Sequence, residues 1–355
     1  FLPLTDRDVN TLWGRMNKTV GRVYLTDIYN VIHSEFVPLF NPFQSYFDHL
    51  PSWDGVSDPI GDLADTVHVK SDQAEFRDYF RKWFVGILPA LLDDTVVNHE
   101  ILVLIGEQGL YKTTWFNFLL PPELRCYFYT KTNSDRLNKD DLFSLTEFAL
   151  ICFEELDGMR PAELNQLKAM VTMPYVNERA AYGRNKERHP HIASFCGTGN
   201  NVQFLTDPTG NRRWLPFEVS QIRDPHLHAI PYELVYSQAY ALWKSGFCHW
   251  FSQEEIRKLN MHNSRFEVPN LEEDLIRTHF RKPFEGEAGI FVTAADILEQ
   301  ISSCLRYPLS PNKIGRIMAG LGLESIRYKG KRGYITVKKT GEDIDRERRS
   351  GALGL

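Results

Sequence analysis

The sequence predicts an α/β protein with a mostly parallel sheet, preceded by a helical region and followed by a small helix-and-hairpin domain. Three observations support this prediction. Apolar runs typical of strands alternate with amphipathic stretches over residues 96–222. The apolar run 101–105 leads directly into a glycine-bearing loop and a helix. Residues 289–340 have the pattern of two helices followed by a hairpin with a basic tip.

The elements can be placed in order along the chain. Residues 1–95 carry aromatic-rich amphipathic stretches and predict a helical N-terminal region. In the core we expect strands at Ile101–Ile105, Cys126–Thr130, Phe148–Phe153, His191–Gly197 and Trp214–Val219, and helices at Lys112–Phe118, Lys139–Thr146 and Pro161–Met170. Residues 223–288 have the pattern of a helical linker or lid, and residues 341–355 that of a flexible tail.

The C-terminal domain has its own signals. Helices are expected at Thr293–Ser302 and Ser310–Leu321, the second beginning with a serine cap and a proline. A hairpin follows, with strands Leu323–Tyr328 and Tyr334–Lys338 around the turn Lys329–Gly333. Two helices and a basic hairpin are typical of a winged helix-turn-helix.

Composition limits the class of protein. The chain has 355 residues, of which 43% are hydrophobic, so two or three domains can each bury a core. Apolar runs stay well short of the roughly 20 residues of a membrane span. The five cysteines are widely spaced, which predicts reduced thiols in a cytoplasmic protein and no zinc site. The first residue is Phe1, so we expect the chain to be part of a longer protein.

The loop after the first core strand has the features that triphosphate binding requires. Gly106 and Gly109 allow a tight turn, and Lys112 stands at the start of a helix whose N–H groups face an anion. Lys112 would reach the β- and γ-phosphates of ATP, and Thr113 would hold Mg²⁺. Thr114 completes the nucleotide-binding set. The pattern calls for glycine before the lysine, where this chain has Tyr111.

Three later elements carry groups suited to ATP hydrolysis. The strand 148–153 ends in Glu154 and Glu155, of which one could hold Mg²⁺ and the other could polarise the attacking water. Asn200 follows the next strand and could orient that water. Arg212 and Arg213 form a turn before the last strand, from which an arginine could project into the active site of a neighbouring subunit.

These elements, in this order, resemble the virulence-associated protein E family. The resemblance covers about residues 45–220 and is most specific at Glu155-Leu-Asp-Gly-Met-Arg160 and Gly210-Asn-Arg-Arg-Trp214. The family is a branch of P-loop ATPases similar to superfamily 3 helicases, which implies an AAA+-like core and a role in phage or mobile-element replication. It further implies a homo-oligomeric ring, hexameric by expectation, and a fused or separate primase as partner. The family usually has Gly-Lys where this chain has Tyr111-Lys112.

The same resemblance implies DNA contacts. In superfamily 3 helicases the segment between the acidic and amide strands is a hairpin that grips DNA. Here that segment carries Tyr182, Arg184, Lys186 and Arg188, which combine charge with a stacking ring. Lys329, Lys331 and Arg332 at the winged-helix tip are expected to contact phosphates.

We therefore expect an ATP-dependent DNA helicase or translocase that binds ATP and Mg²⁺ between subunits of a ring. One alternative is a DNA-binding replication or regulatory protein whose ATPase site is degenerate. Another is a non-motor ATP-dependent regulator or a phosphotransferase. The sequence leaves these alternatives open, and it does not choose between Arg212 and Arg213.

Overall fold

A six-stranded sheet runs through the first part of the chain, in the order β1–β8–β2–β7–β4–β3. Its strands are β1 (Val67–Val69), β2 (Ile101–Ile105), β3 (Phe128–Lys131), β4 (Leu150–Phe153), β7 (Ser194–Gly199) and β8 (Trp214–Ile222). All neighbours pair in parallel except the edge strand β1, which is antiparallel to β8. The expected α/β class with a mostly parallel sheet is thereby confirmed.

The structure is a computed structural model that describes residues 4–132, 139–178, 186–206, 211–268, 271–284, 286–301, 311–341 and 343. The chain divides into two compact units, residues 1–267 and residues 268–355. Each unit has its own core and is described by itself.

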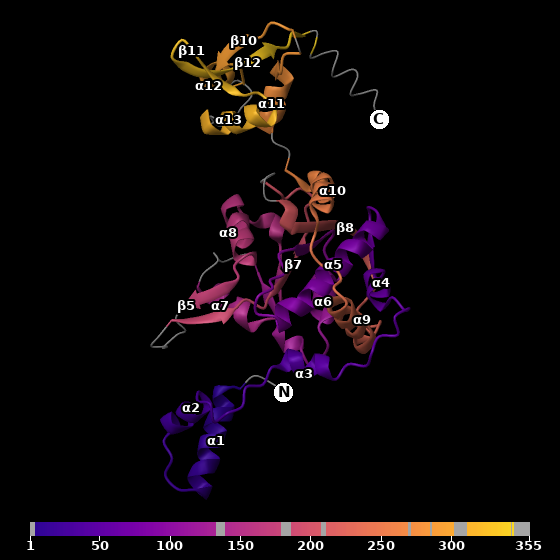
Figure 1. Ribbon diagram of the computed structural model, residues 1–355, viewed down its shortest axis with the longest axis vertical. Coiled ribbons are helices and arrows are strands. Elements are labelled where there is room, and N and C mark those ends of the chain that lie inside the picture. Colours follow the sequence, from indigo (N-terminus) through magenta and orange to yellow (C-terminus); the bar gives the residue numbers. More distant parts are fainter. Residues whose placement is uncertain are drawn as a thin grey trace. The chain divides into compact units, whose positions relative to one another are not determined.

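Helices cover both faces of the central sheet (Figure 1). Side chains alternate along a strand, so Leu102 and Leu104 of β2 join one apolar cluster while Val103 joins the other. The first cluster lies under α3 (Pro42–Asp48), α4 (Pro59–Ala64), α5 (Gln73–Leu92), α6 (Lys112–Leu119), α9 (Tyr232–Lys244) and α10 (Gln253–Asn263). The second lies under α7 (Lys139–Glu147) and α8 (Pro161–Val171). Covering both faces explains why all five residues of β2 are apolar and buried.

Smaller elements complete the first unit. A helical pair, α1 (Asp6–Thr19) and α2 (Leu25–Ile32), begins the described chain, and Thr5 caps α1 through the N–H of Asp8. A two-stranded hairpin joins β5 (Tyr175–Glu178) to β6 (Glu187–Pro190). Single 3₁₀ turns are η1 (Arg125–Tyr127), η2 (Leu156–Gly158), η3 (Asn211–Arg213) and η4 (Ser264–Phe266).

The second unit consists of helices packed on an antiparallel sheet. Its elements are α11 (Leu271–His279), β9 (Phe280–Arg281), β10 (Ile290–Thr293), α12 (Ala294–Ile301), α13 (Pro311–Gly320), β11 (Ser325–Tyr328) and β12 (Lys331–Lys338). The sheet order is β10–β12–β11, with β9 also paired to β12. Ile297, Ile314 and Tyr334 belong to its core.

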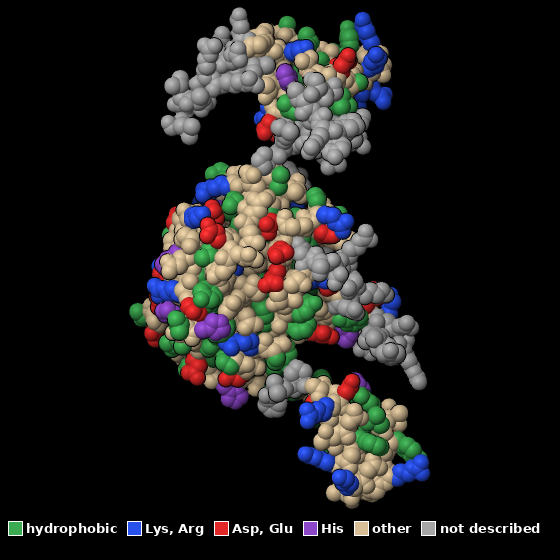
Figure 2. Space-filling model, turned by 180° about the vertical axis from the view of Figure 1, so that it is seen from behind, with side chains coloured by type: hydrophobic (Ala, Val, Ile, Leu, Met, Phe, Trp, Pro, Cys, Tyr) green, Lys and Arg blue, Asp and Glu red, His purple; other side chains and the backbone are tan. Residues whose placement is uncertain are grey.

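The hairpin of the second unit turns more tightly than the sequence predicts. Lys329 and Gly330 alone form the turn, with φ of 47° and 78°, which matches the twist of a two-residue hairpin. Gly333 lies inside β12, where a Cβ atom would come within 2.4 Å of the Val292 carbonyl oxygen. Lys and Arg side chains gather at this end of the unit (Figure 2).

The expected linker at residues 223–288 is divided differently in the structure. Val235, Tyr236 and Leu259 place α9 and α10 in the core of the first unit, whereas α11 belongs to the second. Apolar side chains at helical spacing were sufficient for packing on the sheet, so this stretch is no separate linker.

Within the described residues, no helix has both the length and the hydrophobicity to cross a membrane.

Candidate functional site

The loop between β2 and α6 is closed around the side chain of Lys112. Its Nζ atom donates hydrogen bonds to the carbonyl oxygens of Gly106 at 2.6 Å and Glu107 at 2.7 Å. A third bond, of 3.3 Å, reaches Oδ1 of Asn200 beyond the end of β7. An ammonium group has three N–H donors, so all of them are used. The lysine is thus held at the centre of the loop, although it begins a helix.

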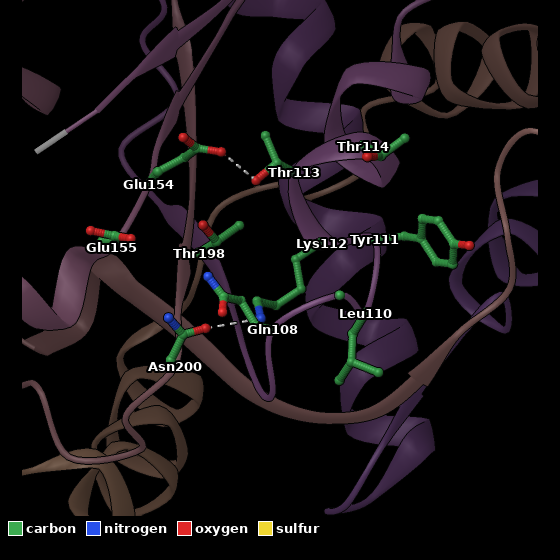
Figure 3. A pocket seen from close by; sticks show the side chains of 11 residues that line it. Gln108, Leu110, Tyr111, Lys112, Thr113, Thr114, Glu154, Glu155, Thr198 and Asn200 are labelled. Atoms are coloured by element: carbon green, nitrogen blue, oxygen red, sulfur yellow. Dashed lines mark hydrogen bonds between the residues drawn. The ribbon is translucent and has the colours of Figure 1, made fainter.

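Tyr111 immediately precedes Lys112 and has a left-handed backbone, with φ of 59° and ψ of 18°. Glycine adopts this conformation without a penalty, whereas a side chain with a Cβ atom does not. The geometry therefore explains why glycine is the usual residue before the lysine in such loops. Tyr111 makes no side-chain cap to α6, and its ring points away from Glu154 (Figure 3).

Gly106 and Gly109 serve the loop in different ways. Gly109 has φ of 87°, a left-handed value that favours glycine. At Gly106 the constraint is space, since a Cβ atom would lie 2.9 Å from the carbonyl oxygen of Val219 on β8. Both glycines therefore have a structural reason to stand where the sequence analysis singled them out.

Thr113 and Glu154 meet although they lie on different elements. Oγ1 of Thr113 donates a 2.8 Å hydrogen bond to Oε1 of Glu154, which directly follows β4. Parallel strands end at the same edge of the sheet, so the residues after β2, β4 and β7 are brought together there. Glu154 is held by its own N–H, which donates to the carbonyl of Lys131 at 3.0 Å.

The converging residues surround a cavity of about 420 Å³. Figure 3 shows Glu154, Glu155 and Asn200 on one side of Lys112 and Tyr111 on the other. The lining residues are Gln108, Gly109, Leu110, Tyr111, Lys112, Thr113, Thr114, Glu154, Glu155, Thr198 and Asn200. The cavity therefore brings together the nucleotide-site residues that were named from the sequence. The exceptions are Gly106, Arg212 and Arg213, which do not line it.

The electrostatics of the cavity centre on Lys112, which is 8% exposed. Burial lowers the pKa of its ammonium group, and the carboxylate of Asp157 opposes that shift. Asp157 accepts hydrogen bonds from the N–H groups of Asn200 at 3.2 Å and Asn201 at 3.0 Å. The Asp157 carboxylate thus has two effects: its charge acts on Lys112, and its oxygens bind the backbone at Asn200 and Asn201.

Arg212 and Arg213 lie at the opposite edge of the sheet. They belong to η3, and the next residue, Trp214, pairs with Ile101 at the beginning of β2. The length of β2 separates that point from the loop, a distance of about 15 Å. Burial lowers the pKa of Arg213 and the charge of Arg212 lowers it further, while Glu100 has the opposite effect. Because of this distance, the side chains of Arg212 and Arg213 do not reach the cavity of their own chain.

The residues expected to bind DNA are partly described. Tyr182 and Arg184 lie outside the described residues. Lys186 is exposed just before β6, and the guanidinium of Arg188 lies 3.5 Å from the ring centroid of Tyr175 across the β5–β6 hairpin. Lys329, Lys331 and Arg332 are exposed at the hairpin of the second unit.

Sequence reasoning missed four contributors to the site. Asp157, Gln108, Leu110 and Thr198 hold or line the cavity. Gln108 and Leu110 could have been inferred from their place inside the loop, and Thr198 from its place at the end of β7. For Asp157, two residues after Glu155, the available signals were an acidic residue close behind the strand and its place in the run 155–160 that resembles the family.

Oxygen atoms suited to Mg²⁺ are present in the cavity. Mg²⁺ prefers carboxylate and hydroxyl oxygens together with phosphate and water. The Thr113 hydroxyl and the Glu154 carboxylate, 2.8 Å apart, provide such a pair next to the loop. The donor set therefore fits the ion. Within the described residues, no group of three or more His, Cys, Asp or Glu side chains could hold a metal.

The comparisons with known proteins cover the part of the chain that forms this cavity. The model of the virulence-associated protein E-like domain matches residues 48–268. The chain belongs to this family. No curated protein sequence matches this virulence-associated protein E-like chain.

Solved structures give a comparison at the level of the fold. The apo structure of the NrS-1 C-terminal region (305–718) is 12% identical to this family member, with a TM-score of 0.50, and the match covers 93% of this chain and 90% of that one. An A-form apo structure of the same region has 13% identity and a TM-score of 0.44, covering 82% and 78%. At such identity, the first likeness shows a shared fold.

Proposed function

We propose that this protein is an ATP-dependent DNA helicase or translocase of a phage or mobile-element replication module. The observation that carries the proposal is the meeting of Lys112, Thr113, Glu154 and Asn200 in one cavity. Lys112 and Thr113 begin α6, whereas Glu154 and Asn200 follow the parallel strands β4 and β7. Membership of the virulence-associated protein E-like family supports the same conclusion.

In this proposal the β2–α6 loop is a P-loop that cradles the phosphates of ATP. The first turn of α6 has no side-chain cap, so its backbone N–H groups can bind phosphate oxygens. Lys112 would leave the carbonyls of Gly106 and Glu107 and pair with the β- and γ-phosphates. When ATP binds, the Lys112 ammonium group would therefore exchange its hydrogen bonds to the loop carbonyls for contacts with the phosphates.

Hydrolysis would use the acidic strand end and the amide. Thr113 and Glu154 would hold Mg²⁺, which when bound would offset charge on the phosphates. Glu155 lines the same cavity and would polarise the attacking water, while Asn200 would orient it. The 3.3 Å contact between Asn200 and Lys112 supports a role for the amide close to the γ-phosphate.

We further propose a homo-oligomeric ring of six subunits. The position of Arg212 and Arg213 at the far edge of the sheet favours action on a neighbour's nucleotide. Each subunit would present its cavity to one neighbour and its arginines to the other. Arg212 is exposed, as a residue that reaches a neighbour must be.

DNA would contact two basic surfaces. The β5–β6 hairpin carries Lys186 and Arg188, and we propose that it lines the path of a single strand, together with Tyr182 and Arg184. The second unit would act as a winged helix whose tip residues Lys329, Lys331 and Arg332 contact phosphates. A primase, fused or separate, would be the natural partner of such a motor.

One observation favours a second candidate, a DNA-binding replication or regulatory protein with a degenerate ATPase site. Tyr111 takes a strained left-handed backbone where glycine is usual, and strain in the loop could weaken nucleotide binding. The intact Lys112, Thr113 and Glu154 favour the first candidate.

The test compares Lys112→Ala with Lys258→Ala, a control on the exposed surface of α10. We expect wild-type protein and the control to bind a fluorescent ATP analogue and to hydrolyse ATP. Lys112→Ala should lower hydrolysis by about a hundredfold or more. Equal hydrolysis by Lys112→Ala and wild type would overturn the proposal, and nucleotide-independent DNA binding by all three proteins would favour the second candidate.

A further inference from the structure

The carboxylate of Asp157 bridges two strands of the site. Asp157 lies in η2, directly after Glu154 and Glu155, and accepts the N–H of Asn200 with one oxygen and that of Asn201 with the other. The distances are 3.2 and 3.0 Å. The acidic end of β4 is thereby joined to the amide-bearing end of β7, which is the adjacent strand.

The local fold is built to permit this bridge. Glu155 has a left-handed backbone with φ of 54°, which turns the chain sharply at the end of β4. Leu156 is buried against Gly197, where a Cβ atom would lie 2.2 Å from its Cδ1. At Gly199 a Cβ atom would lie 3.0 Å from Oδ1 of Asp157. A strained turn and two glycines on β7 therefore bring η2 against the strand end.

The bridge determines where Asn200 can point. With its backbone N–H held by Asp157, the Asn200 side chain places Oδ1 at 3.3 Å from Nζ of Lys112. Asn200 itself is exposed and directly follows the buried strand β7, so the hydrogen bond to Asp157 restrains its backbone where the strand ends. An acidic residue can also support a turn with no part in chemistry, as Asp54 does when it accepts the N–H groups of Val56 and Ser57.

We infer that Asp157 is a positioning residue for ATP hydrolysis, which holds Asn200 in register with Lys112 and Glu154. This inference rests on the proposed function and deepens it. Asp157 itself does not line the cavity. Apart from its charge near Lys112, Asp157 therefore acts through Asn200, and its removal should affect the chemical step more than the binding of nucleotide.

The test is the substitution Asp157→Asn, which keeps the size of the side chain but replaces one acceptor oxygen with an NH₂ donor. That donor would face one of the two backbone N–H groups. We expect kcat to fall on the order of tenfold to a hundredfold, because a displaced catalytic group loses rate steeply. KM for ATP should stay within about threefold of the wild-type value.

A second variant separates positioning from a general loss of structure. If Asp157 acts through Asn200, then Asp157→Asn added to Asn200→Ala should lower kcat by less than about twofold. Asp54→Asn is the matched control, since Asp54 also accepts two backbone N–H groups but in a surface turn outside the cavity. That control should keep the wild-type kcat.

The outcomes are distinct. If the wild-type protein hydrolyses ATP and Asp157→Asn has the same kcat, the inference is overturned but the proposed function is not. The same holds if the losses of kcat from Asp157→Asn and Asn200→Ala multiply in the double variant. Absence of hydrolysis in the wild-type protein overturns the proposed function, and the inference falls with it. A selective loss of kcat that disappears in the Asn200→Ala background supports both.

Discussion

The hydroxyl of Thr113 donates a 2.8 Å hydrogen bond to the carboxylate of Glu154. Thr113 lies in the first turn of α6 and Glu154 follows β4, so this bond joins the start of α6 to the acidic end of that strand. Under the proposed function, these two oxygens would share an Mg²⁺ ion when nucleotide binds. The bond therefore links the two side chains that are proposed to hold the metal.

Thr113→Val should lower ATP hydrolysis on the order of a hundredfold, because valine has the shape of threonine without the hydroxyl. The Mg²⁺ concentration for half-maximal hydrolysis should rise as well. Thr113→Ser keeps the hydroxyl and serves as the control, with activity within a few-fold of wild type. Titration of hydrolysis with Mg²⁺ measures both quantities. Full activity in Thr113→Val would exclude the assigned metal role.

Tyr111→Gly should stabilise the fold relative to Tyr111→Ala. Both substitutions remove a ring that is 42% exposed, but only glycine relieves the left-handed backbone. We expect the free energy of unfolding to be about 1 kcal/mol higher for glycine than for alanine. Urea unfolding of the two variants measures the difference. Equal stabilities would show that the loop carries no strain at this position.

The same pair of variants tests whether the Tyr111 ring covers bound nucleotide. Tyr111 lines the cavity, so stacking of its ring on a base would be lost equally in both variants. We expect ATP binding to weaken about tenfold in each. Equilibrium binding of a fluorescent ATP analogue gives the affinities, and tighter binding by Tyr111→Gly would refute this use of the ring.

The sequence could predict those parts of the fold that depend on local patterns. Five apolar residues before a glycine-bearing loop predicted β2 to the residue, because a doubly covered strand must be apolar throughout. The bridge from Asp157 to Asn200 could not be predicted. It spans 43 residues and depends on a left-handed Glu155, a conformation that no local pattern marks in a residue other than glycine. The edge strand β1 was missed since three residues are too few for periodicity.

Arg212 and Arg213 should act on the nucleotide of a neighbouring subunit. Arg212→Ala and Arg213→Ala should each be compared with the wild-type protein. The arginine that acts on the neighbour's nucleotide is the one whose loss lowers hydrolysis by about a thousandfold. Mixing that variant with Lys112→Ala should restore part of the activity, because some interfaces then combine an intact lysine with an intact arginine. Activity that stays absent in every mixture would argue against a shared site.

The hydrogen bond between Glu75 and His262 should make stability fall in acid. His262 is buried, with Nδ1 at 2.9 Å from Glu75 and Nε2 at 2.7 Å from the carbonyl of Pro216. The hydrogen bond from His262 lowers the pKa of Glu75 below its ordinary value of 4.5, against the effect of burial. A carboxylate whose folded pKa is lowered stabilises the fold above pH 4.5, and that stabilisation is lost as the pH falls further.

Glu75→Gln should therefore cost about 1–2 kcal/mol of unfolding free energy near pH 6. Below pH 4.5 the difference from wild type should shrink. Urea unfolding over a pH series measures it, with Glu254→Gln in an exposed pair on α10 as the control. A cost that does not change with pH would mean that the charge of Glu75 contributes nothing.

The most direct test of the proposed ATP-driven motor is the rate of ATP hydrolysis with and without single-stranded DNA, with molecular mass measured by light scattering in the same solutions. We predict that wild-type protein assembles in the presence of ATP and DNA and that DNA stimulates its hydrolysis. Lys112→Ala should lose that hydrolysis. A monomer whose phosphate release is the same with and without DNA, and the same in Lys112→Ala, would contradict the account.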